Sequence, residues 1–299
     1  LLGEKGGAVC AYLPLNEVHS PVFGRMLASS GFAVCGGLLL ADGDAGQSFA
    51  ALEELALRHS CPAVELRGGV VPEAREGWQI RTDSHCGFVR SLADNDEAEL
   101  LAIPRKQRAE VRKGLERDLT ITVGSGEDDR QAHYAVYAES VRNLGTPVFP
   151  RSLFGAVLDL FGKDADILSV RHDGNPVASV LSLYHRGAVM PYWGGGTWDA
   201  RRLRGNDRMY FELMRHARAR GCSHFDFGRS KTGSGAYDFK RNWGFTPEPL
   251  TYATWTAPGC ERRDADPTSA KHSAQIAIWR RLPLALANRM GPLIAKGLG

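Results

Sequence analysis

The stretch that decides the fold is FDFGRSKTGSGAYDFKRNWGF, residues 225–245. It continues an alternating run that begins at Cys222 and predicts a buried strand. From Gly228 we expect a loop that gathers glycines, hydroxyl groups and two cations, Arg229 and Lys231. Backbone N–H groups approach a ligand closely at glycines, and the cations add charge, so the loop suits an anion or oxyanion. A tight surface turn with solvated charges is the alternative interpretation.

An aromatic and basic segment, Tyr237–Trp243, follows this loop and is closed by Gly244. On the preceding strand, Asp226 is either a buried carboxylate paired with Arg229 or a general base. Of these two interpretations we favour the structural pairing. The 225–245 stretch is therefore the first candidate for the chemistry of the chain.

Composition limits the class of protein. The chain has 299 residues, of which 43% are hydrophobic and 24% charged, as in a globular protein of one large domain or two ordinary ones. No apolar run approaches the roughly 20 residues that a membrane span needs. A net charge of +3 is too small to indicate DNA binding, and we expect none. Residues 268–299 carry five basic residues and no acidic one, which leaves −2 for the rest.

The common catalytic and metal-binding motifs are missing from the sequence. Six cysteines are scattered without a C-x-x-C pair, which predicts reduced thiols in a cytosolic setting. Nine histidines are dispersed, so we predict no metal site. No G-x-S-x-G, H-E-x-x-H, Walker A or dinucleotide fingerprint occurs.

One order of features occurs twice: strand, glycine cluster, helix, cysteine and a further strand. The first copy contains Gly36-Gly37, a helix over 49–59, Cys61 and a strand over 63–66. The second contains glycines 194–196, a basic loop over 201–206, a helix over 207–220, Cys222 and a strand over 223–227. From the last glycine of the cluster to the cysteine the distances are 24 and 26 residues. We interpret this as a duplicated α/β domain.

Further elements precede the second glycine cluster. The pattern predicts helices over 128–143 and 151–161, then a hairpin of strands 166–171 and 177–184 turned at Asp173-Gly174. Between the two copies, a helix over 104–114 carries the cations Arg105, Lys106, Arg108, Arg112 and Lys113. Its basic side is either a solvated face or a face that contacts phosphate. The overall order predicts a mixed α/β layer.

These stretches resemble the FemAB-like proteins of the GNAT superfamily, and more closely the FemAB-related proteins associated with exosortase/PEP-CTERM systems of Gram-negative bacteria. The shared stretches are FDFGRSK…FKRNWGF with the segment from Arg201, PRKQRAEVRKG (104–114), NLGTPVFPRSLF (143–154), PYWGGG (191–196) and the tail 279–299. The resemblance covers nearly the whole chain.

The resemblance implies an α/β (α+β) fold of tandem GNAT-like domains, each a mixed central sheet flanked by helices. We expect a first domain over 1–117, incomplete at its N-terminus and containing the basic helix 104–114. A second domain over 118–258 and a basic amphipathic tail over 259–299 follow. The chain begins without Met or a signal-peptide pattern, so we expect it to start partway into a natural protein.

The resemblance also implies transfer of an acyl or aminoacyl group to the amine of an envelope precursor. The donor is acyl-CoA or aminoacyl-tRNA, without a tightly bound cofactor, in the cytoplasm. Phe239-Lys240 corresponds to the Phe-Lys pair beside the donor in Fem ligases, so Lys240 is the expected catalytic residue, with Tyr237 and Asp226 as proton carriers. The expected donor contacts are Arg201, Arg204, Gly205, Asn206, Arg229, Ser230, Lys231 and Phe239. The expected acceptor contacts are Lys106, Arg108, Arg112 and Tyr192.

Two features of the sequence keep alternatives open. The segment 201–206 has one glycine and three arginines, unlike the glycine-rich CoA loop of acetyltransferases, so a catalytically inactive scaffold for envelope polysaccharide assembly competes with the enzyme. In the tail, the apolar residues Ile276, Trp279, Leu282, Leu286, Met290 and Leu293 recur at helical spacing with only basic charges. The tail either docks onto the domains or attaches residues 276–299 to the periphery of the inner membrane.

Overall fold

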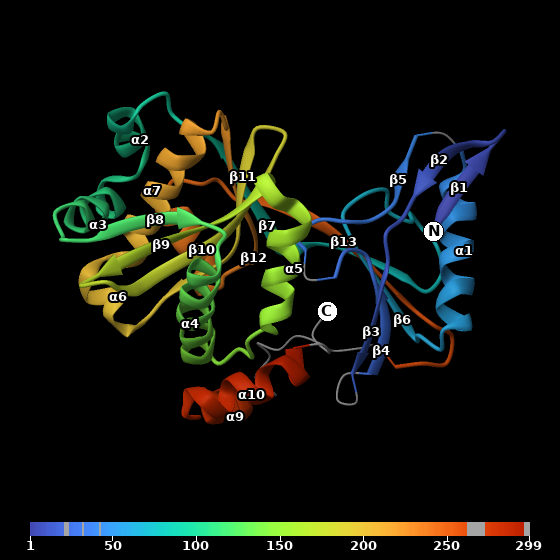
Figure 1. Ribbon diagram of the computed structural model, residues 1–299. Coiled ribbons are helices and arrows are strands. Elements are labelled where there is room, and N and C mark those ends of the chain that lie inside the picture. Colours follow the sequence, from blue (N-terminus) through green and yellow to red (C-terminus); the bar gives the residue numbers. More distant parts are fainter. Residues whose placement is uncertain (21–23, 32, 42, 262–272, 296–299) are drawn as a thin grey trace. The chain divides into compact units, whose positions relative to one another are not determined.

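A computed structural model describes residues 1–20, 24–31, 33–41, 43–261 and 273–295 (Figure 1). These residues form two compact units. Of the described residues, unit 1 contains 1–86, 249–261 and 293–295, and unit 2 contains 87–248 and 273–292. The expected boundary at residue 117 lies within unit 2, and residues 249–258 lie in unit 1. Of the predicted tail, residues 262–272 and 296–299 lie outside the described residues.

Unit 1 is built on a mixed sheet with one helix against it. Its strand order is β3 (Asn16–Ser20), β4 (Gly24–Ala28), β6 (Ala63–Arg67), β13 (Glu248–Thr256) and the first part of β7 (Trp78–Ser91). β4 and β6 are parallel, whereas β6 and β13 are antiparallel. Helix α1 (Ala45–Arg58) buries Phe49, Leu52 and Ala56 in the core, and the Asp44 side chain caps it by accepting from the Gly46 N–H at 2.7 Å. A small separate sheet contains β1 (Leu2–Lys5), β2 (Ala8–Tyr12) and β5 (Leu39–Leu40).

Unit 2 contains the longer run of strands. After the end of β7 the order is β12 (His224–Lys231), β11 (Ala188–Gly196), β10 (Asn175–His185), β9 (Ala165–His172) and β8 (Thr120–Gly124). The predicted β9–β10 hairpin is present, and its turn places Asp173 and Gly174 at positive φ, as an Asp-Gly turn requires.

Helices cover both faces of the unit 2 sheet (Figure 1). On one face, α4 (Glu127–Leu144) and α5 (Arg151–Phe161) share a core with Ile167 and Leu181. On the other face lies α7 (Gly205–Ala219), whose His216 meets Asp166 of β9 at 2.8 Å. The remaining helices are α2 (Asp96–Ala102), α3 (Arg105–Leu115), the 3₁₀ turn η1 (Gly162–Asp164), α6 (Trp198–Leu203) and α8 (Gly235–Asn242).

Residues 273–295 of the tail contain two helices, and residues 273–292 belong to unit 2. It forms α9 (Ser273–Trp279) and α10 (Leu284–Ala295), drawn in red in Figure 1. The Arg280 guanidinium donates to the Leu144 carbonyl at 3.2 Å, and Ile276 lies against Gly145. This tail therefore docks on the end of α4, as one of the two interpretations expects.

Two local predictions are wrong. The expected loop from Gly228 is still strand, because β12 continues to Lys231 and Gly228 takes a positive φ of 67° within it. The expected basic loop over 201–206 is helical, because α6 and α7 are joined directly by Arg204 in the left-handed conformation at φ 58°. The sequence analysis also missed β7, β8 and α2.

Candidate active site

The strands β11 and β12 part from one another near their starts. They run parallel, but their ladder consists of two residue pairs, Ala188 with His224 and Val189 with Phe225. Both strands then continue, β11 to Gly196 and β12 to Lys231. On its other side β11 stays paired with β10 as far as Gly196. The carboxyl ends of two parallel strands, left apart, are a common position for a ligand in open α/β sheets.

Tyr192, an expected acceptor contact, lies in an irregularity of β11. Leu181 of β10 is opposite Trp193, and Ser182 is opposite Pro191, so Tyr192 is the extra residue of a β-bulge. Its ring lies 5.2 Å from the ring of Trp193 and packs partly on the core of unit 2. A bulge of this kind re-aims side chains, while β10 and β11 stay paired on both sides of it.

The corresponding place in unit 1 is closed by backbone contacts. There the glycines 36–37 precede α1 as the glycines of β11 precede α7. Val70 N donates to the Leu38 carbonyl at 2.9 Å, so the segment after Gly36-Gly37 pairs with the segment after Gly68-Gly69, which follows β6. A Cβ added at Gly37 would lie 1.9 Å from the Gly68 carbonyl oxygen. Of the two copies, unit 2 is therefore the one with parted strands.

Lys240 is buried beside this part of β12. Helix α8 begins after Ser234, whose hydroxyl accepts from the Tyr237 N–H at 3.2 Å, and it places Lys240 one turn later with 9% of its surface exposed. The Lys240 ammonium donates to the Arg229 carbonyl at 2.8 Å and lies 5.4 Å from the ring centre of Phe88. Burial lowers the pKa of Lys240 to about 8, against an opposite effect of the Asp226 carboxylate.

Asp226 is the acidic neighbour of this ammonium. Its carboxylate accepts a hydrogen bond from the Gly228 N–H at 2.8 Å. Burial raises the pKa of Asp226, while that hydrogen bond and the charge of Lys240 act to lower it. A carboxylate and an ammonium whose pKa values burial shifts toward each other form a pair suited to proton exchange.

Two further expected residues of α8 lie in aromatic surroundings. Tyr237 meets Phe88 edge-on, with ring centres 5.5 Å apart. Phe239 lies between Phe227 of β12 at 6.1 Å and Tyr210 of α7 at 5.6 Å. Contacts between these rings pack α8, which carries Lys240, against α7 and β12.

The expected donor arginines already have partners within unit 2. Arg204 makes an ion pair with Glu110 of α3 at 2.6 Å. Arg201 lies over the ring of Trp198, with 4.2 Å from its guanidinium carbon to the ring centre. Trp198 is itself exposed, so this cation and aromatic ring form a flat surface at the start of α6.

Two buried polar atoms near the parted strands lack a hydrogen-bond partner among the described residues. They are the side-chain oxygen of Asn206, at the start of α7, and the hydroxyl of Ser230, on β12. A Cβ added at Gly196, the last residue of β11, would lie 2.5 Å from that Asn206 oxygen. Buried polar atoms without partners are rare in folded proteins and indicate a place for water or ligand.

The other three expected acceptor residues, Lys106, Arg108 and Arg112, lie on α3. Arg108 and Arg112 line a groove of about 430 Å³ with Arg105, Lys113, Ala109 and Glu116. Lys106 is exposed on the same helix. The side-chain amide of Gln107 donates to Asp207 at 2.6 Å and so fastens α3 to α7. The helix that carries these three residues therefore packs on α7, which begins next to Arg204.

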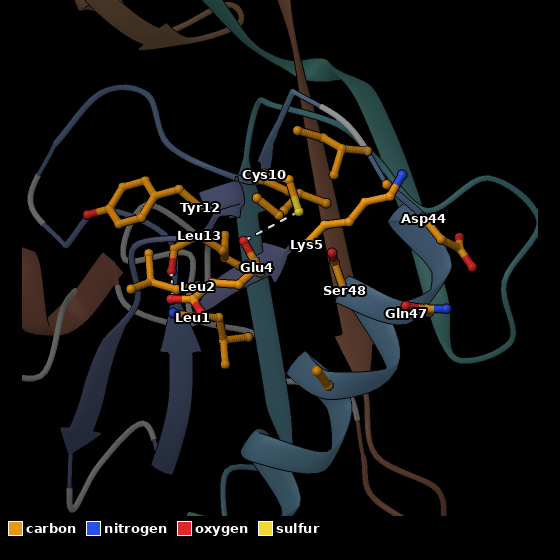
Figure 2. Close-up of a pocket in the computed structure, with 16 residues that line it drawn as sticks. Leu1, Leu2, Glu4, Lys5, Cys10, Tyr12, Leu13, Asp44, Gln47 and Ser48 are labelled. Carbon is orange, nitrogen blue, oxygen red and sulfur yellow. Dashed lines mark hydrogen bonds between the residues drawn. The ribbon is translucent and has the colours of Figure 1, made fainter. Parts of the chain in front are cut away.

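A separate cavity of about 700 Å³ lies in unit 1 (Figure 2). β1, β2, β5 and α1 enclose it, with Leu13, Leu38 and Leu40 among its apolar lining. Ser48 of α1 points toward it, and the Cys10 thiol donates to the Gly3 carbonyl at 3.4 Å. The sequence analysis did not predict this cavity, and none of the expected site residues lines it.

No group of three His, Cys, Asp or Glu side chains among the described residues is arranged to hold a metal ion. No described helix is both long and apolar enough to cross a bilayer.

Residues 105–241 match the acetyltransferase (GNAT) domain family. This stretch begins with α3 and ends in α8, so the GNAT match contains the parted strands, Lys240 and the basic groove of α3. In a comparison with curated proteins, no sequence is similar enough to count as a match.

Solved structures extend the likeness beyond residues 105–241. FemX is 14% identical with a TM-score of 0.62, over 84% of this chain and 86% of that one. L-PGS from Bacillus licheniformis is 14% identical with a TM-score of 0.55, over 91% and 85%. A tandem GNAT protein from the clavulanic acid biosynthesis pathway is 14% identical with a TM-score of 0.53, over 86% and 82%. The predicted mixed α/β fold of tandem GNAT type is thereby confirmed.

Proposed function

We propose that this chain is an acyltransferase of FemAB type, which moves an activated acyl or aminoacyl group from its donor to an amine. The observation that carries this proposal is the buried ammonium of Lys240, next to the parted strands of a GNAT fold. A buried lysine with a lowered pKa, beside two parallel strands whose pairing ends early, is a candidate for catalysis.

In this mechanism the amine nitrogen attacks the carbonyl carbon of the donor ester or thioester. The carbonyl electron pair moves to its oxygen, and Lys240, together with N–H groups of residues 228–235, stabilises the oxyanion. The intermediate collapses when the bond to the donor breaks, and the departing alkoxide or thiolate takes up the proton that the amine loses. Each such donor to an oxyanion is typically worth about 3 kcal/mol in the transition state.

We assign the proton transfer to Asp226, with Tyr237 as the second carrier. The raised pKa of Asp226 makes it a better proton acceptor than an exposed aspartate, because burial penalises its charged form. The charge of Lys240 acts on the pKa of Asp226, so a proton taken by Asp226 changes the electric field at the same oxyanion.

The donor we favour is aminoacyl-tRNA rather than acyl-CoA. A CoA pyrophosphate is usually held by backbone N–H groups of a glycine-rich loop at a helix start. In this chain the helix α6 occupies the position of that loop, so fewer backbone N–H groups are available to a pyrophosphate. The Arg204 side chain is also engaged, in an ion pair with Glu110. The exposed Trp198 with Arg201 over it suits a terminal nucleobase, because rings and guanidinium groups both stack on bases.

The acceptor in this proposal is an envelope precursor that carries both an amine and phosphate. The groove of α3 supplies the phosphate contact through Arg108 and Arg112, and Tyr192 lies near the acceptor amine. The proposed setting is the cytoplasmic side of the inner membrane, in an exosortase/PEP-CTERM-associated or polysaccharide pathway.

The test offers the chain two labelled donors, acetyl-CoA and a pool of aminoacyl-tRNAs, with an extract of Gram-negative envelope precursors. We expect label to pass from aminoacyl-tRNA to an amine product, and Lys240→Met to abolish that transfer. Lys163→Met, at an exposed lysine, is the matched control and should keep it. Transfer from acetyl-CoA alone would show that the donor is acyl-CoA and not aminoacyl-tRNA. If neither donor binds, the result would favour the inactive scaffold.

A further inference from the structure

Helix α10 turns large apolar side chains outward. Leu286, Met290, Leu293 and Ile294 are all exposed, and Leu293 reaches 74%. They recur at intervals of four, three and one residues, so they form one continuous stripe along the helix, which we call the outer stripe. A contiguous exposed apolar stripe of this kind marks an interaction surface.

The opposite side of α10 carries small residues, apart from Leu284 at its start, which packs on the core of unit 2. Ala287 and Ala295 are buried, and Gly291 packs so closely that an added Cβ would lie 2.9 Å from Val148. A surface helix normally buries its large apolar residues and exposes polar ones. In α10 the four large residues of the outer stripe are exposed instead, so they are not required for packing on unit 2.

The charge around the outer stripe has one sign. Residues 273–295 contain Arg280, Arg281 and Arg289 and no acidic residue. All three arginines are exposed. Arg289 follows Leu286 by three residues and precedes Leu293 by four, so it borders the stripe on the helix surface. Cationic side chains at the edge of an apolar face can reach headgroup phosphates while their stems lie along the acyl region.

The segment is held in place before it meets a partner. Arg142 donates to the Arg280 carbonyl at 3.2 Å, and Arg280 in turn donates to the Leu144 carbonyl at the same distance. Ile278 of α9 and Leu144 of α4 are exposed beside these bonds. A preformed helix binds without the loss of entropy that ordering a free peptide would require.

We propose that α10 lies in the surface of an anionic lipid bilayer. The outer stripe enters the boundary between headgroups and acyl chains, and Arg281 and Arg289 contact headgroup phosphates. A second copy of the chain fits this face less well, because a two-fold contact between two such helices brings basic residues together without any acid. The surface attachment needs no membrane-spanning helix and does not depend on the proposed transferase activity.

The experiment is sedimentation of the whole chain with vesicles of phosphatidylcholine containing 30% phosphatidylglycerol, and with phosphatidylcholine alone. We expect binding to the anionic vesicles and at least about tenfold weaker binding to neutral ones. The triple variant Leu286→Ser, Met290→Ser and Leu293→Ser should weaken binding at least about tenfold. Arg281→Gln with Arg289→Gln should weaken it on anionic vesicles only, and added salt should have the same effect.

Matched controls are Leu57→Ser on α1 and Leu101→Ser on α2, which are exposed leucines on other helices. They should bind as the unchanged chain does, and circular dichroism should show that all variants fold. Absence of binding to anionic vesicles would overturn the proposal. So would binding that survives the triple variant, since it would then arise elsewhere, for example at the basic groove of α3. A dimer in solution that the triple variant dissociates would show that a second copy covers the stripe.

Discussion

The ammonium of Lys240 donates a hydrogen bond to the main-chain carbonyl of Arg229 across 2.8 Å. The two residues are eleven apart in the chain, and the bond joins α8 to the end of β12. One N–H of the ammonium is thereby fixed in direction, so the other two are oriented without substrate. A donor oriented in advance stabilises a developing charge without reorganisation during the reaction.

The first prediction concerns Lys240→Met. We expect turnover to fall about 100-fold or more, because the oxyanion loses its charged donor. We expect the melting temperature to stay the same or rise. The lowered pKa means that burying this charge opposes folding by about 3 kcal/mol at neutral pH, and methionine removes that charge. Thermal unfolding and turnover, measured on the same preparations, check both parts. A lower melting temperature with unchanged turnover would make Lys240 structural.

The second prediction is an alkaline limit on activity. Lys240 has a folded-state pKa of about 8, so its ammonium is lost as the pH rises past that value. We expect kcat/KM to decline above about pH 8 with a slope of one proton. In Lys240→Arg any remaining activity should lack this decline, because guanidinium does not titrate there. Activity that increases above pH 8 would instead make the neutral amine of Lys240 the base.

The same pKa fixes the sign of a stability effect. Because the folded-state pKa lies below the ordinary value of 10.5, the unfolded chain binds the proton more tightly. The contribution of Lys240 to stability therefore increases as the pH rises from about 8 to about 10.5. Urea unfolding across this window, compared between the chain and Lys240→Met, isolates that contribution.

The third prediction concerns the groove of α3. Arg108→Gln combined with Arg112→Gln should weaken binding of inorganic pyrophosphate at least about tenfold, because charge-assisted bonds to phosphate are lost. Once the acceptor is identified, the double variant should show a higher KM for it, while kcat stays within about twofold. Titration calorimetry measures the first effect. Arg81→Gln with Arg186→Gln, at two exposed arginines outside this groove, should leave pyrophosphate binding unchanged.

The fourth prediction separates strain from donor binding at Arg204. This residue has φ 58°, which costs a non-glycine residue roughly 1 kcal/mol, and its partly exposed ion pair with Glu110 returns less than that. Arg204→Gly should therefore keep or raise the melting temperature while it weakens binding of aminoacyl-tRNA. Glu110→Gln is the companion variant, because it removes the ion pair and leaves the arginine free for donor phosphate. Equal donor affinity in both variants would exclude Arg204 from the donor site.

Elements with local end signals were predictable from the sequence. Helix α5 has the predicted bounds of 151–161, because Pro150 precedes it and Gly162 ends it. The hairpin at Asp173-Gly174 was equally local. These signals depend on residues that are neighbours in the chain, so an isolated sequence contains them.

The candidate site depends on contacts between residues that are far apart in the chain, and a single sequence does not reveal such contacts. Gly228 suggests the end of a strand, but β12, which is the neighbour of β7 in the sheet, continues to Lys231. The arginines of 201–206 suggested a free loop, but Glu110 and Trp198 engage two of them and the segment is helical. The burial of Lys240 likewise requires Phe88, about 150 residues earlier.

The early end of the β11–β12 ladder offers a way to find a substrate before its identity is known. Amide protons engaged in strand pairing are protected from exchange with heavy water, and protection falls where pairing stops. A compound that settles between the two strands would slow deuterium uptake in the peptides covering residues 190–196 and 226–231. Mixtures of cell metabolites could therefore be screened by mass spectrometry for compounds that slow deuterium uptake in these peptides. Such a screen requires no assumption about the reaction.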